Sequence, residues 1–126
     1  MQDEPTPSEL TKAVADFLRN EIAPLISGHN AFKLRVAINA LDLVTRQLTL
    51  EQGGDAAESA RLAQLLGEHG SLLELNRDLA ERIAVGELDL RTPGLSEHLW
   101  QTTMDKLAVD QPNYAAYKRE LGNKSD

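Results

Sequence analysis

The chain has 126 residues, a formal net charge of −7 and no cysteine. This length suits one domain, and without cysteine the chain has neither a disulfide framework nor a thiolate metal site. The negative charge repels nucleic acid and anionic lipid, and no apolar run approaches the roughly 20 residues that span a bilayer. The acidic N-terminus carries no apolar secretory segment. The sequence therefore predicts a cytoplasmic protein that binds neither nucleic acid nor membrane.

The N-terminal segment carries clear signals for the start and the end of a helix. Residues 6–9, Thr-Pro-Ser-Glu, form a capping box with proline at the first helical position, where the missing N–H costs nothing. Pro24 removes a backbone hydrogen bond and clashes with the preceding turn, so it predicts a kink or the end of the helix. Residues 27–30 then predict a turn, in which Asn30 caps the next helix.

The segment Phe32–Leu50 predicts a helix that is apolar over most of its circumference. Its polar stripe falls within an arc of about 60° at 100° per residue. The stripe consists of Arg35, Asn39, Asp42 and Arg46. Because a surface helix normally has a broad polar face and a narrower apolar one, these reversed proportions predict a mostly buried central helix.

Four further helices are predicted after the central one. Gly53-Gly54 predicts a break, after which Asp55 begins a short helix that ends at Leu66. The next two helices begin at Ser71 and at Thr92-Pro93, and the last covers residues 113–121.

Connections this short imply that neighbouring helices run antiparallel. The sequence therefore predicts an all-α fold, with about six helices in a bundle around the mostly buried helix Phe32–Leu50. We expect one domain over residues 1–126, with frayed ends at residues 1–5 and 123–126.

The polar stripe of the central helix has two interpretations. Arg35 and Arg46, with Asn39 and Asp42 between them, have the chemistry of a pocket for an anionic ligand, because guanidinium groups pair well with phosphate and carboxylate. Alternatively, the stripe is a solvent-facing or internally paired seam in which Asp42 and Arg46 form an i, i+4 ion pair. The structural interpretation is favoured, since structural ion pairs outnumber functional ones.

The same stripe predicts a polar cluster with a later turn of the chain. A buried arginine needs a carboxylate, so Arg35 and Asn39 are predicted to meet Asp105. Tyr114 would cap this group, because tyrosine combines an apolar ring with a polar tip. The cluster is either structural or part of a ligand site.

The sequence contains no recognisable catalytic or metal-binding motif. His29, His69 and His98 lie far apart and share no metal-ligand spacing. No serine stands in G-x-S-x-G, and Gly53-Gly54 lacks the following lysine of a phosphate-binding loop. These features favour a non-catalytic protein without a metal or cofactor, and they leave the question of an enzyme open.

Two segments, Phe32–Leu41 and Asp105–Tyr114, resemble a family of short bacterial proteins of unknown function. Members are typically encoded beside aminoglycoside-phosphotransferase-like kinases and acyl-CoA dehydrogenases. The resemblance therefore implies an accessory role near such an enzyme, and no particular reaction.

Two functional hypotheses follow. The leading one is a non-catalytic interaction module whose partner is a neighbouring metabolic enzyme, phosphotransferase-like or acyl-CoA dehydrogenase-like. The alternative is a binder, or an enzyme component, for an anionic small molecule such as an acyl-CoA or a phosphorylated metabolite. A homo-oligomer is a further form of association that the leucine- and alanine-rich composition allows.

Overall fold

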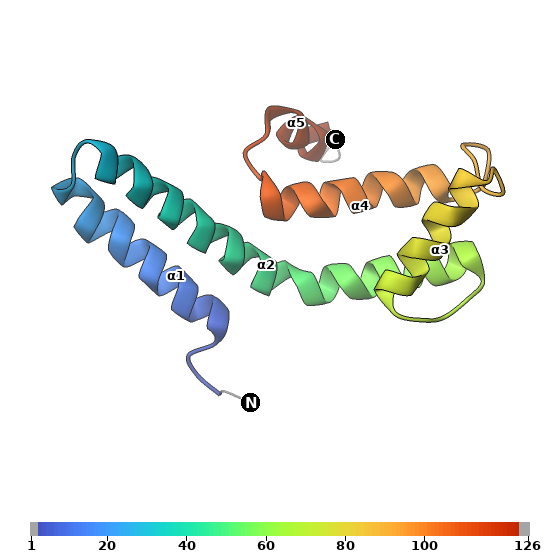
Figure 1. The fold of residues 1–126 in the computed structure, drawn as a ribbon, viewed down its shortest axis with the longest axis horizontal. Helices are drawn as coiled ribbons and strands as arrows, with labels where there is room; N and C mark the ends of the chain where they lie inside the picture. Colours follow the sequence, from blue (N-terminus) through green and yellow to red (C-terminus); the bar gives the residue numbers. More distant parts are fainter. Residues whose placement is uncertain (1–2, 124–126) are drawn as a thin grey trace. The chain divides into compact units, whose positions relative to one another are not determined.

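The computed structural model describes residues 3–123, and every regular element within them is a helix (Figure 1). The predicted all-α class is confirmed. None of these helices is long and apolar enough to cross a membrane. The α-helices are α1 (Pro7–Phe17), α2 (His29–Leu66), α3 (Leu72–Ala84), α4 (Leu95–Asp110) and α5 (Ala115–Asn123), and two short helical turns, η1 (Leu18–Ile22) and η2 (Ala23–Leu25), follow α1.

Contacts divide the chain into two compact units. Unit 1 comprises residues 1–51 and contains α1, η1, η2 and the first part of α2. Unit 2 comprises residues 52–126 and contains the rest of α2 together with α3, α4 and α5. The helix α2 is thus common to both units.

The helix α2 is one continuous element of 38 residues. The predicted break at Gly53-Gly54 and the separate helix from Asp55 to Leu66 are therefore wrong, and the described residues contain five α-helices in place of about six. Neither of the two glycines adopts a positive φ. Glycine in a helix interior costs about 1 kcal/mol relative to alanine, but it keeps the N–H that proline lacks. The two glycines weaken the helix without ending it.

In unit 1, α1 begins at the predicted capping box. The Oγ1 of Thr6 accepts a hydrogen bond from the Glu9 N–H at 3.3 Å, and the Glu9 carboxylate accepts one from the Thr6 N–H at 2.7 Å. After Phe17 the helix widens into η1 and then tightens into η2, which contains Pro24. The predicted end of the first helix near this proline is confirmed.

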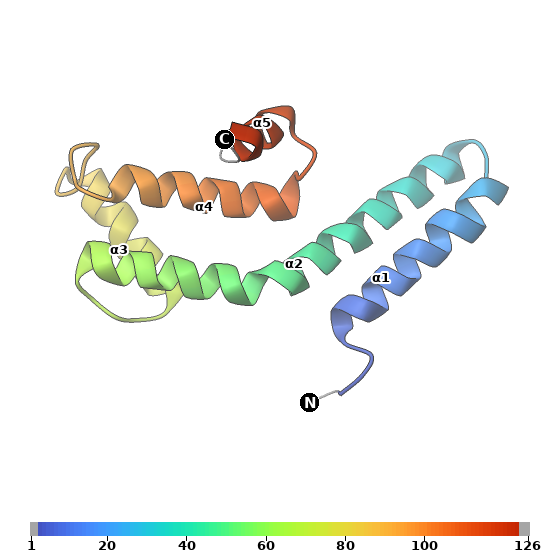
Figure 2. The same cartoon turned by 180° about the vertical axis from the view of Figure 1, so that it is seen from behind.

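The helix α1 lies antiparallel to the first part of α2, as both views of the ribbon show (Figures 1 and 2). The hydroxyl oxygens of Thr11 and Thr45 are 2.7 Å apart across this hairpin. Ala15 on α1 and Ile38 on α2 are the buried hydrophobic residues in the described part of unit 1. Two residues make a very small core for two helices.

The predicted burial of Phe32–Leu50 is wrong for this chain. Within that segment only Ile38 is buried, whereas Phe32 and Val36 are 60% and 52% exposed. Within unit 1, α2 has only α1 and the short turns that follow it as neighbours, so one flank of α2 is buried and the other flanks are accessible. The apolar circumference of the helix follows from its sequence, but the number of neighbours that cover it does not.

Unit 2 is built around five buried leucines. Leu62 and Leu66 come from α2, Leu75 and Leu79 from α3, and Leu95 from the start of α4. The i, i+4 spacing of the first two pairs places each pair on one face of its helix. Full burial of a leucine side chain contributes about 1.5–3 kcal/mol. This cluster is therefore the main source of hydrophobic stabilisation in unit 2.

The connection from α2 to α3 follows the sequence signals closely. Gly67 has a φ of +70° just after the last residue of α2, a conformation that costs glycine little. Ser71 then caps α3: its Oγ accepts a hydrogen bond from the Glu74 N–H at 3.2 Å, and the Glu74 carboxylate accepts one from the Ser71 N–H at 3.0 Å. Both helix boundaries are as predicted.

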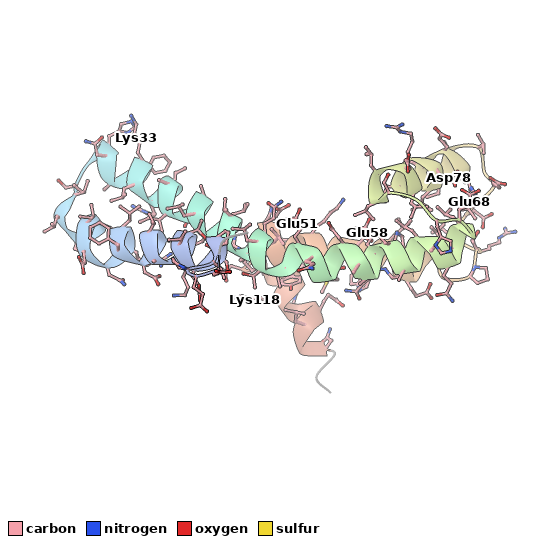
Figure 3. All side chains as sticks on the ribbon, turned by 90° about the horizontal axis from the view of Figure 1, so that it is seen from below. Lys33, Glu51, Glu58, Glu68, Asp78 and Lys118 are labelled. Atoms are coloured by element: carbon pink, nitrogen blue, oxygen red, sulfur yellow. The ribbon has the colours of Figure 1, made fainter. Side chains whose placement is uncertain are left out.

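Arg82 links the end of α3 to the connection between α2 and α3. Its guanidinium approaches the carboxylates of Asp78 at 2.8 Å and Glu68 at 3.1 Å, two acids that Figure 3 labels. It also donates to the backbone oxygen of Leu66 at 3.4 Å. The hydrogen bond with Asp78 is the main cause of the raised pKa of Arg82. One arginine thus joins α3, the α2–α3 connection and the end of α2.

Candidate functional site

The polar stripe predicted on the central helix takes part in a chain of ion pairs in unit 1. Asp42 pairs with Arg19 of η1 at 2.5 Å, and Arg19 also pairs with Asp16 at 3.0 Å. Lys12 lies 2.6 Å from Asp16, and its hydrogen bond is the main cause that holds the pKa of Asp16 below its usual range. Arg46 is half-buried. Asp42 therefore has a structural role that involves Arg19, a partner that the sequence analysis missed.

The other members of the predicted cluster are divided between the two units. Arg35 and Asn39 are exposed in unit 1. In unit 2, Asp105 approaches Arg61 at 3.5 Å, and Tyr114 is exposed. A cluster of Arg35, Asn39, Asp105 and Tyr114 would have to form between the units, and it stays a prediction.

A cleft of about 730 Å³ lies within unit 2, between the later turns of α2 and the first turns of α4. Its volume falls in the range of about 300–1,000 Å³ that is usual for small-molecule sites. The cleft is lined by Arg61, Gln64 and Leu65 of α2, by Thr92, Pro93 and Gly94 of the preceding turn, and by Glu97, His98 and Gln101 of α4. It is the candidate site considered for unit 2.

Gly94 at the start of α4 is favoured by its backbone conformation and not by a lack of space. Its φ of +88° lies in the left-handed region that favours glycine. A Cβ at this position would lie 3.4 Å from the Cδ2 of Leu65. Gly94 is also the N-cap of α4 and provides no side-chain acceptor for the N–H groups of the first turn.

His98 is a buried polar residue, only 2% exposed, at the inner side of this cleft. Its Nδ1 accepts a hydrogen bond from the Nε–H of Arg61 at 3.3 Å, which leaves the ring proton of a neutral imidazole on Nε2. Burial is the main cause that lowers the pKa of His98, and the charge of Arg61 lowers it further. His98 is therefore neutral at neutral pH.

Arg61 connects α2 with three side chains of α4. Besides His98, its guanidinium approaches Thr102 Oγ1 at 3.4 Å and Asp105 at 3.5 Å. Well-formed bonds between a guanidinium and a carboxylate measure about 2.7–2.9 Å, and Arg82 reaches 2.8 Å with Asp78. The contacts of Arg61 are all longer, so its hydrogen-bonding capacity is only partly used.

Neither His98 nor Arg61 was predicted from the sequence as a site residue. A signal for His98 was present, because it follows Leu95 by three residues and therefore shares the buried face of α4. Arg61 directly precedes the core residue Leu62, and no local pattern identifies such a position as a site. Within the described residues, no group of three or more acidic or histidine side chains is placed to hold a metal ion.

A family model described as a domain of unknown function, DUF6285, matches residues 24–114. The chain belongs to the DUF6285 family. The DUF6285 match begins within η2, covers α2, α3 and α4, and includes all the residues that line the cleft. Neither the curated proteins nor the solved structures contain a significant match to the chain.

His98, which lies in the segment that matches DUF6285, is expected to make the free energy of unfolding depend on pH. Burial lowers the pKa of His98 in the folded chain below its ordinary value of 6.5, so the unfolded chain takes up a proton first as the pH falls. The free energy of unfolding should therefore be insensitive to His98 well above pH 6.5 and should decrease as the pH falls below about 6.5.

Urea unfolding between pH 7.5 and pH 5.5 measures this effect. The variant His98→Asn keeps a polar side chain but does not titrate, so its stability should decrease less over the same range. Equal pH dependence in the wild type and the variant would contradict the prediction.

Proposed function

We propose that this DUF6285 protein is a non-catalytic interaction module that binds another protein through one face of unit 1. The observation that supports the proposal is a group of large hydrophobic side chains that the hairpin leaves accessible. They are Leu10, Val14 and Phe17 of α1 and Val44 and Leu48 of α2, each between 41% and 50% exposed, and together they are called the apolar face.

Helix geometry places these five side chains on the same side of the hairpin. On α1, Thr11 contacts α2, and Leu10, Val14 and Phe17 follow the i, i+4, i+7 spacing of an adjoining stripe. On α2, Val44 directly precedes Thr45, the residue that contacts α1. Because the two helices are antiparallel, both stripes turn to the same side.

The opposite side of the hairpin is polar. It carries the ion pairs of Lys12, Asp16, Arg19 and Asp42. The hairpin thus carries its ion pairs on the side opposite the apolar face.

The energetics favour covering the apolar face. Ala15 and Ile38 are the buried hydrophobic residues of the described hairpin, and a helical segment with so little tertiary packing is marginal in water. Burial of a large apolar side chain contributes about 1.5–3 kcal/mol, so covering the accessible half of each of the five would contribute about 1 kcal/mol per residue. A partner that buries this face therefore stabilises the hairpin as it binds.

The family resemblance suggests which kinds of partner to test first: a phosphotransferase-like kinase or an acyl-CoA dehydrogenase-like enzyme, as the resemblance implies. Arg35 is exposed and lies with Arg46 on the polar side of α2. An anionic ligand such as an acyl-CoA or a phosphorylated metabolite, held by these arginines, would therefore be compatible with a protein bound to the apolar face.

The test is to measure binding of the full chain to each purified neighbouring enzyme. Val14→Glu and Val44→Glu place a charge in the apolar face and should weaken the complex at least tenfold, because the charge would be buried without a partner. Leu90→Glu is the matched control, since Leu90 is 83% exposed and lies in unit 2. Circular dichroism should show that all three variants keep their helix content.

Two results would overturn the proposal. The first is binding of both apolar-face variants with the affinity of the wild type. The second is a homodimer in light scattering that Val14→Glu dissociates, because the face would then be occupied by a second copy and not by an enzyme.

A further inference from the structure

We infer that the cleft of unit 2 is a binding site for a small monocarboxylate, with Arg61 as the residue that holds the carboxylate. This site is independent of the apolar face, because every residue that lines it lies in unit 2. It also differs from the site predicted on the polar stripe of α2, because its arginine is Arg61 and not Arg35 or Arg46.

The first step is the state of Arg61. Its side chain is 26% exposed, so it is held among neighbours and yet accessible. Nε donates to His98, and Nη2 approaches Thr102 and Asp105. None of these contacts uses Nη1, and all are at least 3.3 Å long. An incoming carboxylate can accept from Nη1 without breaking a short bond.

The second step is the role of His98 as a positioning residue. It is almost fully buried and accepts from Nε, so it fixes the plane of the guanidinium against α4. Because its pKa is lowered, His98 stays neutral and adds no positive charge beside Arg61. The cleft thus presents one oriented cation, as carboxylate recognition requires.

The acidic side chains around Arg61 indicate the charge of the ligand. Glu97 lines the same cleft, and Asp105 pairs with Arg61 from α4. With Asp105 on the guanidinium and Glu97 in the lining, charge repulsion disfavours a dianion such as a phosphate monoester more than a monoanion. The site therefore matches a single carboxylate better than a phosphate.

The rest of the lining suits a short organic body. Leu65 and Pro93 supply apolar contact surface, while Gln64, Gln101 and Thr92 supply neutral hydrogen-bonding groups. A few polar groups among apolar ones is the usual composition of a small-molecule site. The ligand class is thus a small carboxylic acid with a short apolar or weakly polar chain.

The test titrates the full chain with sodium benzoate, with benzamide as its neutral isostere and phenyl phosphate as a dianion, followed by ¹H–¹⁵N NMR. Benzoate should shift amide signals of residues 61–65 and 92–101 and should bind at least tenfold more tightly than benzamide or phenyl phosphate. Equal binding of benzoate and benzamide, or tighter binding of phenyl phosphate, would overturn the inference.

Variants assign the effect to Arg61. Arg61→Gln should weaken benzoate binding at least tenfold, but it also removes the partner of Asp105 and can reduce stability. Gln64→Glu avoids this complication, because Gln64 is exposed and the change only adds a negative charge to the cleft. It should weaken benzoate binding severalfold, whereas Arg77→Gln on the exposed surface of α3 should leave it unchanged. Unchanged binding in Gln64→Glu would place the benzoate elsewhere and overturn the inference.

Discussion

Substitution Leu62→Ala is expected to lower the free energy of unfolding of unit 2 by about 3 kcal/mol, because a fully buried leucine loses its transfer free energy and leaves a cavity. Leu62 is 0% exposed and packs in the leucine cluster with Leu66, Leu75, Leu79 and Leu95. Since these neighbours come from three different helices, they have little freedom to close the cavity.

Urea unfolding followed by circular dichroism measures the loss. The matched control is Leu73→Ala, the same substitution in the same unit at a residue that is 70% exposed. It should change stability by less than about 0.5 kcal/mol. Equal losses in the two variants would contradict the core described above.

The double substitution Gly53→Ala with Gly54→Ala is expected to stabilise the chain by about 1–2 kcal/mol. Each glycine lies inside α2 without a positive φ, and a Cβ at either position would meet nothing within 4 Å. Alanine removes the conformational freedom that glycine has in the unfolded chain, and it costs no contact in the folded one.

Gly28→Ala is the control for this prediction, because a Cβ there would also meet nothing within 4 Å. Gly28 has a φ of +70°, however, so the same substitution is strained and should destabilise the chain by about 1 kcal/mol. In thermal unfolding, the melting temperature should therefore rise for the double variant and fall for Gly28→Ala. A lower melting temperature for the double variant would show that α2 is interrupted at residues 53–54.

Signals that act within a few residues predicted the structure well. Thr6 and Ser71 each cap a helix through a reciprocal bond with the glutamate three residues later, and Gly67 ends α2 with a positive φ. These interactions need no distant partner, so the sequence contains all of their components. The all-α class follows from the same local signals.

Features that depend on distant contacts were predicted less well. The apolar circumference of Phe32–Leu50 indicated burial, but within unit 1 only α1 and the short turns after it are available to cover it, and Phe32 is 60% exposed. The break at Gly53-Gly54 was predicted from intrinsic propensity, which helix continuity overrides at a modest cost. A local sequence pattern does not show how many elements will pack against a helix. It also does not show how much unfavourable free energy from glycine a long helix can tolerate.

The candidate site illustrates the same limit. Arg61 and His98 are 37 residues apart and meet because Leu62, which follows Arg61, and Leu95, one helical turn before His98, pack in one cluster. A hydrogen bond between two helices leaves no spacing motif in the sequence. The polar stripe of α2 was easier to see because its members are neighbours on one helix.

The continuity of α2 also affects how the chain begins to fold. Starting a helix is unfavourable, since several residues are ordered for the first hydrogen bond, whereas each later residue adds a bond of its own. Because α2 runs from unit 1 into unit 2 as one element, a single nucleus serves both units. A first turn formed around Leu62 can be extended toward Ile38, or the reverse. Helix formation that begins in one unit can therefore be propagated into the other.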